Sequence, residues 1–134
     1  MRVQLQKNAI DLGIVTSNLE PMVAFYRDLL GFREEPSTPF HGGGVMVRLW
    51  CGDSLIKIVA PEPAPTIKPA PGPLEQATGY RYWTMRVDNL EEVVALCADA
   101  GHKVIVPITE VRPGVTISMV EDPDGNWVEF VDYA

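Results

Sequence analysis

The chain of 134 residues is the size of one ordinary domain, and its 46% of hydrophobic residues can bury a sizeable core. Its formal net charge of −7 disfavours nucleic acid as a partner, because an acidic surface repels phosphate backbones. Two cysteines, Cys51 and Cys97, are too few for a disulfide framework. Since the sequence shows neither a membrane-spanning apolar stretch nor a signal-peptide core, we expect a cytoplasmic protein that does not bind membranes.

The first half of the chain predicts one strand, one helix and three further strands. Residues 9–15 alternate in part, as a strand does. Ser17 and Asn18 supply a helix N-cap, and Gly31 stands where a glycine commonly ends a helix. The apolar residues at helical spacing between them are Met22, Phe25, Tyr26 and Leu29. Later strands are expected near residues 32–35, at 45–50 and at 54–59, the last two joined by a turn at 51–53.

The same order of elements returns after a linker at residues 61–79 that holds six prolines. Residues 80–87 predict a strand, and Asp88 and Asn89 begin a capped helix that Gly101 ends. The apolar face of this helix is expected to consist of Val93, Val94, Leu96, Cys97 and Ala100. Strands are expected at residues 103–108, 115–120 and 126–131, and we interpret residues 121–125 as a tight turn rather than a calcium-binding loop.

The two halves align with each other. Asn18-Leu19-Glu20 returns 71 positions later as Asn89-Leu90-Glu91, and the strand Leu55–Val59 returns 72 positions later as Trp127–Val131. An internal repeat of this kind indicates two equivalent supersecondary units. The sequence therefore predicts an α+β fold with two tandem βαβββ modules, near residues 8–60 and 80–132, within a single domain of residues 1–134.

Two segments carry a resemblance to a known family. They are FYRDLLGF at residues 25–32 and EDPDGNWVEF at residues 121–130. Both resemble signatures of the vicinal-oxygen-chelate superfamily, which contains the glyoxalases, bleomycin-resistance proteins and extradiol dioxygenases, and the resemblance extends over residues 8–132. It implies a curled mixed sheet that forms a half-open cup, with helices outside, a functional site on the concave face and, as in many members, a homodimer.

The resemblance also implies four metal-ligand positions, at Asp11, Lys57, Tyr82 and Glu129. Metal-dependent members carry His or Gln, Glu, His and Glu there, so only Glu129 matches cleanly. An ammonium group such as that of Lys57 cannot ligate a metal and repels a divalent ion at close range. We therefore expect no metal and no other cofactor. The alternative is a rebuilt metal site from Glu129, Asp11 and His41.

Strand alternation assigns further side chains to the same face as these four positions. On the cup face we expect Gly13, Val15, Leu55, Val59, Thr84, Arg86, Trp127 and Val131. On the opposite face, under the helices, we expect Ile10, Leu12, Ile14, Ile56, Ile58, Trp83, Met85, Val87, Val128 and Phe130. The cup face thus combines acids, bases, a phenol and an indole, and a polar set of this kind needs partners or a ligand.

These residues suggest acid–base chemistry. Glu129 is the favoured base, Lys57 and Tyr82 are the candidates for stabilising charge, and Asp11 completes the candidate catalytic set. The candidates for ligand contact are Arg86, Arg48, Trp127, His41 and Thr84. The arginines suit a carboxylate or phosphate, and the indole suits a planar ligand. A purely structural alternative remains, in which Lys57 neutralises Asp11 or Glu129 in place of a metal.

Three functions remain open. The first is a metal-independent isomerase, epimerase or lyase that binds a small oxygenated metabolite. The second is a bleomycin-resistance-type protein that sequesters a drug, which the charge of −7 favours and the basic residues of the cup disfavour. The third is a divalent-metal-dependent lyase or dioxygenase.

Overall fold

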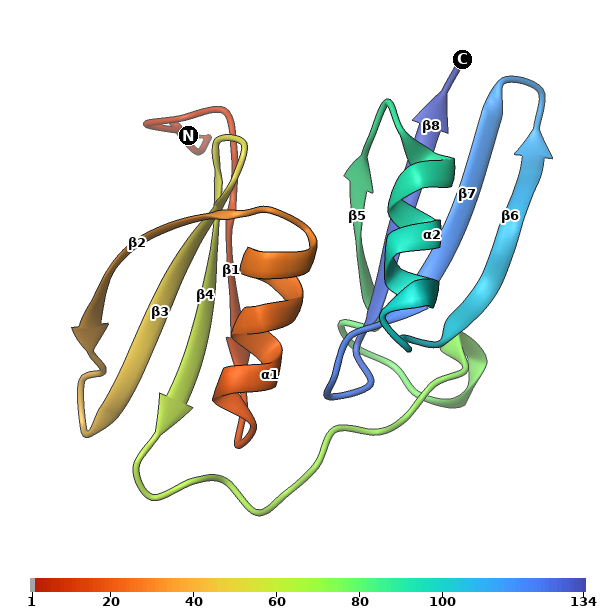
Figure 1. Cartoon of the computed structure of the whole chain (residues 1–134). Helices are drawn as coiled ribbons and strands as arrows, with labels where there is room; N and C mark the ends of the chain where they lie inside the picture. Colours follow the sequence, from red (N-terminus) through yellow and green to blue (C-terminus); the bar gives the residue numbers. More distant parts are fainter. Residues whose placement is uncertain (1) are drawn as a thin grey trace. The chain divides into compact units, whose positions relative to one another are not determined.

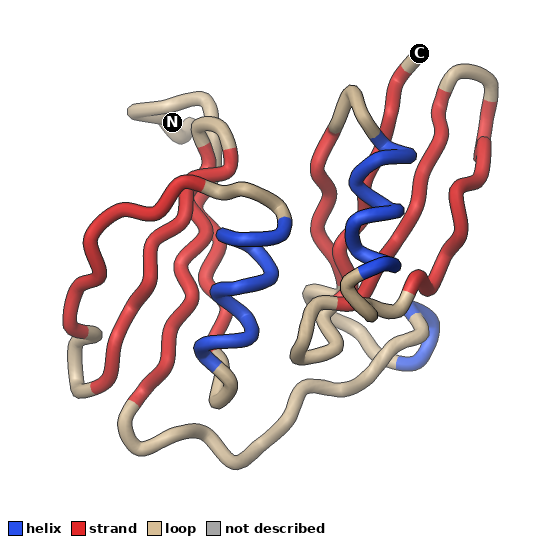
Figure 2. The backbone as a smooth tube through the Cα atoms, viewed as in Figure 1, coloured by secondary structure: helices blue, strands red, loops and turns tan. Residues whose placement is uncertain are grey.

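The computed structural model describes residues 2–134, apart from the side chains of residues 37 and 38. The chain forms two compact units, Met1–Ile67 and Lys68–Ala134, whose boundary falls inside the proline-rich segment. Each unit consists of a four-stranded mixed sheet with one helix across one of its faces (Figure 1; Figure 2). The predicted α+β fold of two tandem βαβββ modules is therefore confirmed. Among the described residues, no helix has the length and apolarity needed to cross a bilayer.

Unit 1 has its first and last strands side by side. Its elements are β1 (Asp11–Val15), α1 (Leu19–Val23), the π-helical continuation η1 (Ala24–Leu29), β2 (Arg33–Pro39), β3 (Gly44–Cys51) and β4 (Ser54–Pro61). The strand order is β1-β4-β3-β2, with β1 parallel to β4 and the other pairs antiparallel. This order makes β4 a central strand, and Ile56 and Ile58 on it are almost fully buried.

The strand ends of unit 1 differ from the sequence prediction where pairing partners decide them. β1 begins at Asp11, whose partner is Leu55, so Ile10 precedes the paired region and is 71% exposed. The assignment of Ile10 to the helix-covered face was therefore wrong. β2 runs on to Pro39 because β3 supplies partners beyond the expected end, across a register shift after Glu35.

The α1–η1 helix buries three of the four side chains that its spacing predicted, and the fourth, Leu29, is half-buried. Met22, Phe25 and Tyr26 are at most 2% exposed, and the Phe25 and Tyr26 rings meet edge to face at 4.8 Å. Gly31, at a φ of +84°, ends the helix as expected. The predicted side-chain cap at Asn18 is not formed; instead the Asn18 amide donates to Thr16 Oγ1 at 2.8 Å.

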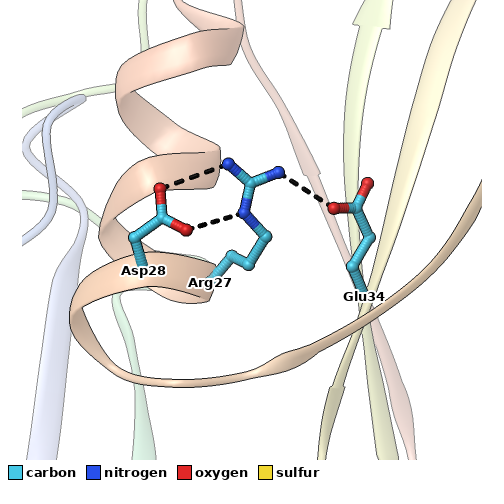
Figure 3. A network of polar contacts seen from close by, with 3 residues as sticks. All are labelled: Arg27, Asp28 and Glu34. Carbon is cyan, nitrogen blue, oxygen red and sulfur yellow. Dashed lines mark hydrogen bonds and ion pairs between the residues drawn. The ribbon is translucent and has the colours of Figure 1, made fainter.

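An exposed polar network joins the end of this helix to β2. The Arg27 guanidinium donates to both carboxylate oxygens of Asp28, at 2.8 and 3.2 Å, and to Glu34 Oε1 at 2.9 Å (Figure 3). The two carboxylates raise the pKa of Arg27, Asp28 more strongly than Glu34, and the guanidinium lowers the pKa of Asp28. Because the network lies in solvent, its energetic contribution is screened.

Unit 2 repeats the topology of unit 1. Its elements are the short 3-10 helix η2 (Leu74–Gln76), β5 (Tyr82–Arg86), α2 (Leu90–Asp99), β6 (Val104–Arg112), β7 (Val115–Glu121) and β8 (Trp127–Tyr133). The strand order is β5-β8-β7-β6, and β5 is parallel to β8. Val128 and Phe130 on the central strand β8 are at most 1% exposed and form the middle of the core.

The buried stripe of α2 is narrower than predicted. It consists of Leu90, Val94 and Cys97, whereas Leu96 is 43% exposed and Ala100 is exposed. Successive residues of an α-helix are about 100° apart, so the i, i+4, i+7 set shares one face and Leu96 lies outside it. Asn89 stands at the N-cap without a side-chain capping hydrogen bond, and Gly101 ends the helix at a φ of +89°.

The turn between β7 and β8 is built around one buried carboxylate. Asp122 Oδ1 accepts from the amides of Asp124 and Asn126, each at 2.9 Å, and Asp122 Oδ2 accepts from Asn126 Nδ2. Gly125 supplies a φ of +85°. Asp122 Oδ1 thus fixes the backbone of the turn and Oδ2 holds the Asn126 side chain, which confirms the hairpin turn predicted for this segment.

Candidate functional site: the open faces of the two sheets

Each sheet has one face covered by its helix and one face free of it. In unit 1 the register places Val47 opposite Ile58 and Leu49 opposite Ile56, which defines the buried face. The alternate side chains of the same strands form the other face. We call this second face the open face; in unit 1 it carries Asp11, Gly13, Val15, Glu35, Arg48, Trp50, Leu55, Lys57 and Val59.

Lys57 lies in the middle of the open face of unit 1. Its neighbours across the strands are Gly13 on β1 and Arg48 on β3. A Cβ atom added to Gly13 would meet nothing within 4 Å, so there is free space beside the lysine. Among the described residues of unit 1, the half-buried Lys57 side chain has no ion-pair partner. Lys57 is therefore available to a negatively charged or oxygen-rich ligand.

Asp11 pairs with a residue that the sequence analysis did not consider. Its Oδ1 lies 2.8 Å from Lys7 Nζ, and both side chains are 39% exposed. The hydrogen bond from Lys7 lowers the pKa of Asp11, and the charge of Lys57 acts in the same direction more weakly. Asp11 is thus neutralised by Lys7 rather than by Lys57. The spacing of four residues was the one signal in the sequence, but that spacing brings charges together in helices, and this segment is not helical.

Arg48 is also engaged within unit 1. Its Nη2 lies 2.9 Å from Glu35 Oε2, on the neighbouring strand β2. Beside this pair, the Trp50 ring has Lys7 Nζ at 4.7 Å and the Arg33 guanidinium at 5.8 Å from its centroid. Glu35, Arg33 and Trp50 therefore belong to the open face, although the sequence did not single them out.

His41 lies at the far end of the sheet from Asp11. It is exposed in the turn between β2 and β3, next to Gly44, which pairs with Pro61. Asp11 pairs with Leu55, so the two positions are separated along β4 by six residues, or roughly 20 Å at about 3.3 Å per residue. The register thus does not bring Asp11 and His41 together as a rebuilt metal site would require.

In unit 2 the open face joins two of the predicted residues. Thr84 on β5 lies opposite Glu129 on β8, and Thr84 Oγ1 donates to Glu129 Oε1 at 2.6 Å. Glu129 Oε2 has no hydrogen bond among the described residues. Two residues earlier on β5, Tyr82 lies opposite Trp127 and is 48% exposed. The carboxylate is therefore held by one oxygen, and the other can accept a proton or a ligand hydrogen bond.

Arg86 lies against an aromatic ring. Its guanidinium carbon is 3.9 Å from the centroid of Tyr133, which follows Val131 on the same face of β8. Tyr133 was not among the residues predicted from the sequence, although it extends the alternation Trp127, Glu129, Val131 by one step. This stacking orients Arg86 and leaves its guanidinium edge free for hydrogen bonding.

The donor chemistry at the four implied ligand positions does not fit a divalent metal. Asp11 offers a carboxylate that is already paired with Lys7, and Lys57 offers an ammonium. The other two positions offer the phenol of Tyr82 and the carboxylate of Glu129. Divalent ions in proteins usually take three or more carboxylate, imidazole or thiolate donors. Among the described residues, no three such side chains gather.

Comparisons with known proteins place the whole chain in one group. The family model for the Glyoxalase/Bleomycin resistance protein/Dioxygenase superfamily matches residues 9–130. A glyoxalase family protein from Bacillus anthracis is 25% identical, with 100% of each chain covered and a TM-score of 0.69. One from Bacillus cereus is 16% identical, with 98% of this chain and 96% of that chain covered and a TM-score of 0.82.

A third similar structure is TnmS3, an antibiotic binding protein from Streptomyces sp. CB03234. It is 18% identical, with 98% of this chain and 100% of that chain covered and a TM-score of 0.71. No curated protein sequence matches the chain. At these identities the structural matches show a shared fold.

Proposed function

Because the chain belongs to the Glyoxalase/Bleomycin resistance protein/Dioxygenase superfamily, we propose that it binds a small oxygenated molecule without a divalent metal. The observation that carries this proposal is Lys57. Its ammonium stands beside open space at Gly13 on the open face of unit 1, at a position where metal-dependent relatives have a ligand. A cation without an ion-pair partner in the described part of unit 1 offers a ligand carboxylate or carbonyl oxygen the positive charge that a metal ion offers elsewhere.

The polar groups of unit 2 support acid–base chemistry, as in an isomerase, epimerase or lyase. Glu129 is the base, and Thr84 holds one of its oxygens so that the other faces the ligand. It takes a proton from carbon next to a carbonyl group, and Tyr82 on the same open face stabilises the negative charge that develops on oxygen. Arg86, oriented by Tyr133, holds a carboxylate elsewhere on the ligand.

The second candidate is a drug-sequestering protein. Tyr82 and Tyr133 are each 48% exposed on the open face of unit 2, which suits a planar ligand. Of the basic residues that disfavour a cationic drug, Arg48 is a weaker objection than the sequence suggested, because it is paired with Glu35. The net charge of −7 favours such a ligand.

A ligand screen followed by a proton-exchange assay tests both candidates. Thermal shift with small hydroxy and keto acids, and with a cationic glycopeptide such as bleomycin, identifies the ligand class. For an acid that binds, we expect the chain to exchange the proton next to the carbonyl with deuterium from solvent. Glu129→Gln should lower exchange by about a hundredfold or more while binding persists, because only the base is lost.

The matched control is Glu110→Gln, which removes an exposed carboxylate from β6. Lys57→Ala should weaken binding of the acid with the fold intact. Stabilisation by bleomycin without any proton exchange would favour sequestration. Wild-type exchange in Glu129→Gln would refute the assignment of the base.

A further inference from the structure

The segment Lys68–Pro73 folds onto unit 2, and we call it the strap. Arg81, just before β5, donates from Nη1 to the Ala70 carbonyl at 2.9 Å and from Nη2 to the Pro71 carbonyl at 2.7 Å. Three of the six strap residues are prolines, which have no amide hydrogen to donate. The guanidinium therefore supplies the hydrogen bonds that hold this segment in place.

A second contact fixes the strap to the sheet. Gly72 lies directly on the Trp127 indole, so that a Cβ atom added there would come within 2.3 Å of Cζ2 and 2.5 Å of Cε2. The backbone of Gly72 is not in the left-handed region, so it is the indole that excludes a side chain. The contact thus joins Gly72, which has no side chain, on the strap to the aromatic ring of Trp127 on β8.

The strap forms one wall of a cavity of about 620 Å³ in unit 2. The opposite wall consists of the ends of β6 and β7 and the turn that leads into β8. Known sites for small ligands have volumes of roughly 300–1,000 Å³. The cavity lies beyond the end of β8 at which Trp127 stands, and it shares Trp127 and its cross-strand partner Glu121 with the open face of unit 2.

The lining of the cavity has a charge balance opposite to that of the chain. It contains three basic residues, Lys68, Arg81 and Lys103, and two acidic ones, Glu121 and Asp124. The chain as a whole has 11 basic and 18 acidic residues. The Lys103 side chain is 75% exposed, and its Nζ is as far as 4.0 Å from Glu121 Oε1. This long ion pair leaves the ammonium able to turn to a ligand. Tyr80, which is fully exposed, and Trp127 supply aromatic surface.

We propose that this cavity binds a small aromatic carboxylate, with its ring against Tyr80 and Trp127 and its carboxylate at Lys68 and Lys103. Aromatic surface next to an ammonium group selects a flat anion, and the strap closes over it. Neither Lys57 nor Glu129 lines the cavity, so this proposal does not depend on the proposed function. On this inference the proline-rich segment is part of a binding site as well as a connector.

The test is titration of the isotope-labelled chain with 2-naphthoate, followed by proton–nitrogen NMR. We expect the largest shifts at the Trp127 indole N–H and at the amides of Gly72 and Gly125. Replacement of Lys68 and Lys103 together by alanine should raise the dissociation constant about tenfold or more, since charged hydrogen bonds are lost. The matched control Arg112→Ala removes an exposed charge outside the cavity and should change the dissociation constant by less than about twofold.

Gly72→Ala is the second variant, and it should abolish these shifts while the signals of unit 1 stay in place. Neutral 2-naphthamide should bind about tenfold more weakly than the carboxylate. Equal affinity for the two compounds, unchanged affinity in the double lysine variant, or shifts that do not include Trp127 and Gly72 would overturn the proposal.

Discussion

Single residues on the open faces owe their properties to neighbours that are distant in sequence or on another strand. Glu129 is oriented by Thr84, which lies 45 positions earlier, and Arg48 is held by Glu35 on β2. The sequence identified Glu129 through resemblance, Thr84 through alternation and Arg48 as an arginine suited to an anion. It did not identify Lys7, Glu35 or Tyr133, because these contacts depend on the register of β2, on the course of residues 2–10 and on the full length of β8.

The Lys7–Asp11 pair gives a prediction about pH. Lys7 lowers the pKa of Asp11 below its ordinary value of 3.8. A carboxyl group with a lowered folded pKa stabilises the fold above its unfolded pKa, and this contribution is lost as pH falls through the folded pKa. In Lys7→Ala we expect the Asp11 titration to move back up toward the ordinary value, as measured by carbon NMR of its carboxyl group. Arg2→Ala is the control, and an unmoved midpoint in Lys7→Ala would contradict the pairing.

At the scale of elements, local sequence signals predicted turns and helix ends, whereas tertiary pairing decides where strands end. The hairpin turns at Gly52-Asp53 and Asp122–Gly125, and the helix ends at Gly31 and Gly101, were predictable because glycine and aspartate fix the backbone locally. Strand ends were not, since pairing decides them: β2 extends because β3 runs alongside it, and Ile10 stays outside because the pairing of β1 with β4 begins at Asp11.

The contrast between Ile10 and Ile56 tests this account of unit 1. Ile56 is 1% exposed in the centre of the sheet, whereas Ile10 is 71% exposed just before β1. We expect Ile56→Val to lower the free energy of unfolding by about 0.5–1.5 kcal/mol, because a buried methyl group is lost. Ile10→Val removes a methyl group from a solvent-exposed side chain and should lower the free energy of unfolding by less than about 0.5 kcal/mol. Urea denaturation measures both, and equal effects would contradict the placement of β1.

At the scale of the whole molecule, the repeat in sequence predicted the repeat in structure. Asn18 and Asn89 precede equivalent helices, and Leu55–Val59 and Trp127–Val131 lie in the equivalent central strands β4 and β8. The chemistry is less symmetric than the fold. Unit 1 presents an ammonium at the middle of its open face, and unit 2 presents a carboxylate.

This asymmetry leads to a prediction about metal. Lys57 and the paired Asp11 make unit 1 a poor source of metal ligands, so we expect no dependence on divalent ions. Dialysis against a chelator should leave the melting temperature and ligand affinity of the chain unchanged, and added zinc, nickel, iron or manganese should not raise either. Stoichiometric metal in protein purified without chelator, measured by elemental analysis, would count against the proposed chemistry.

The parallel pairing of first with last strand governs how each half is completed during synthesis. β1 has no partner until β4 has been made, so residues 11–15 must wait for residues 55–59. The same holds for β5 and β8, and β8 is also the strand that separates β5 from β7. When β5, β6 and β7 have left the ribosome, the sheet of unit 2 therefore still lacks its central strand β8. A nascent chain at that stage exposes strand edges to chaperones or to other chains.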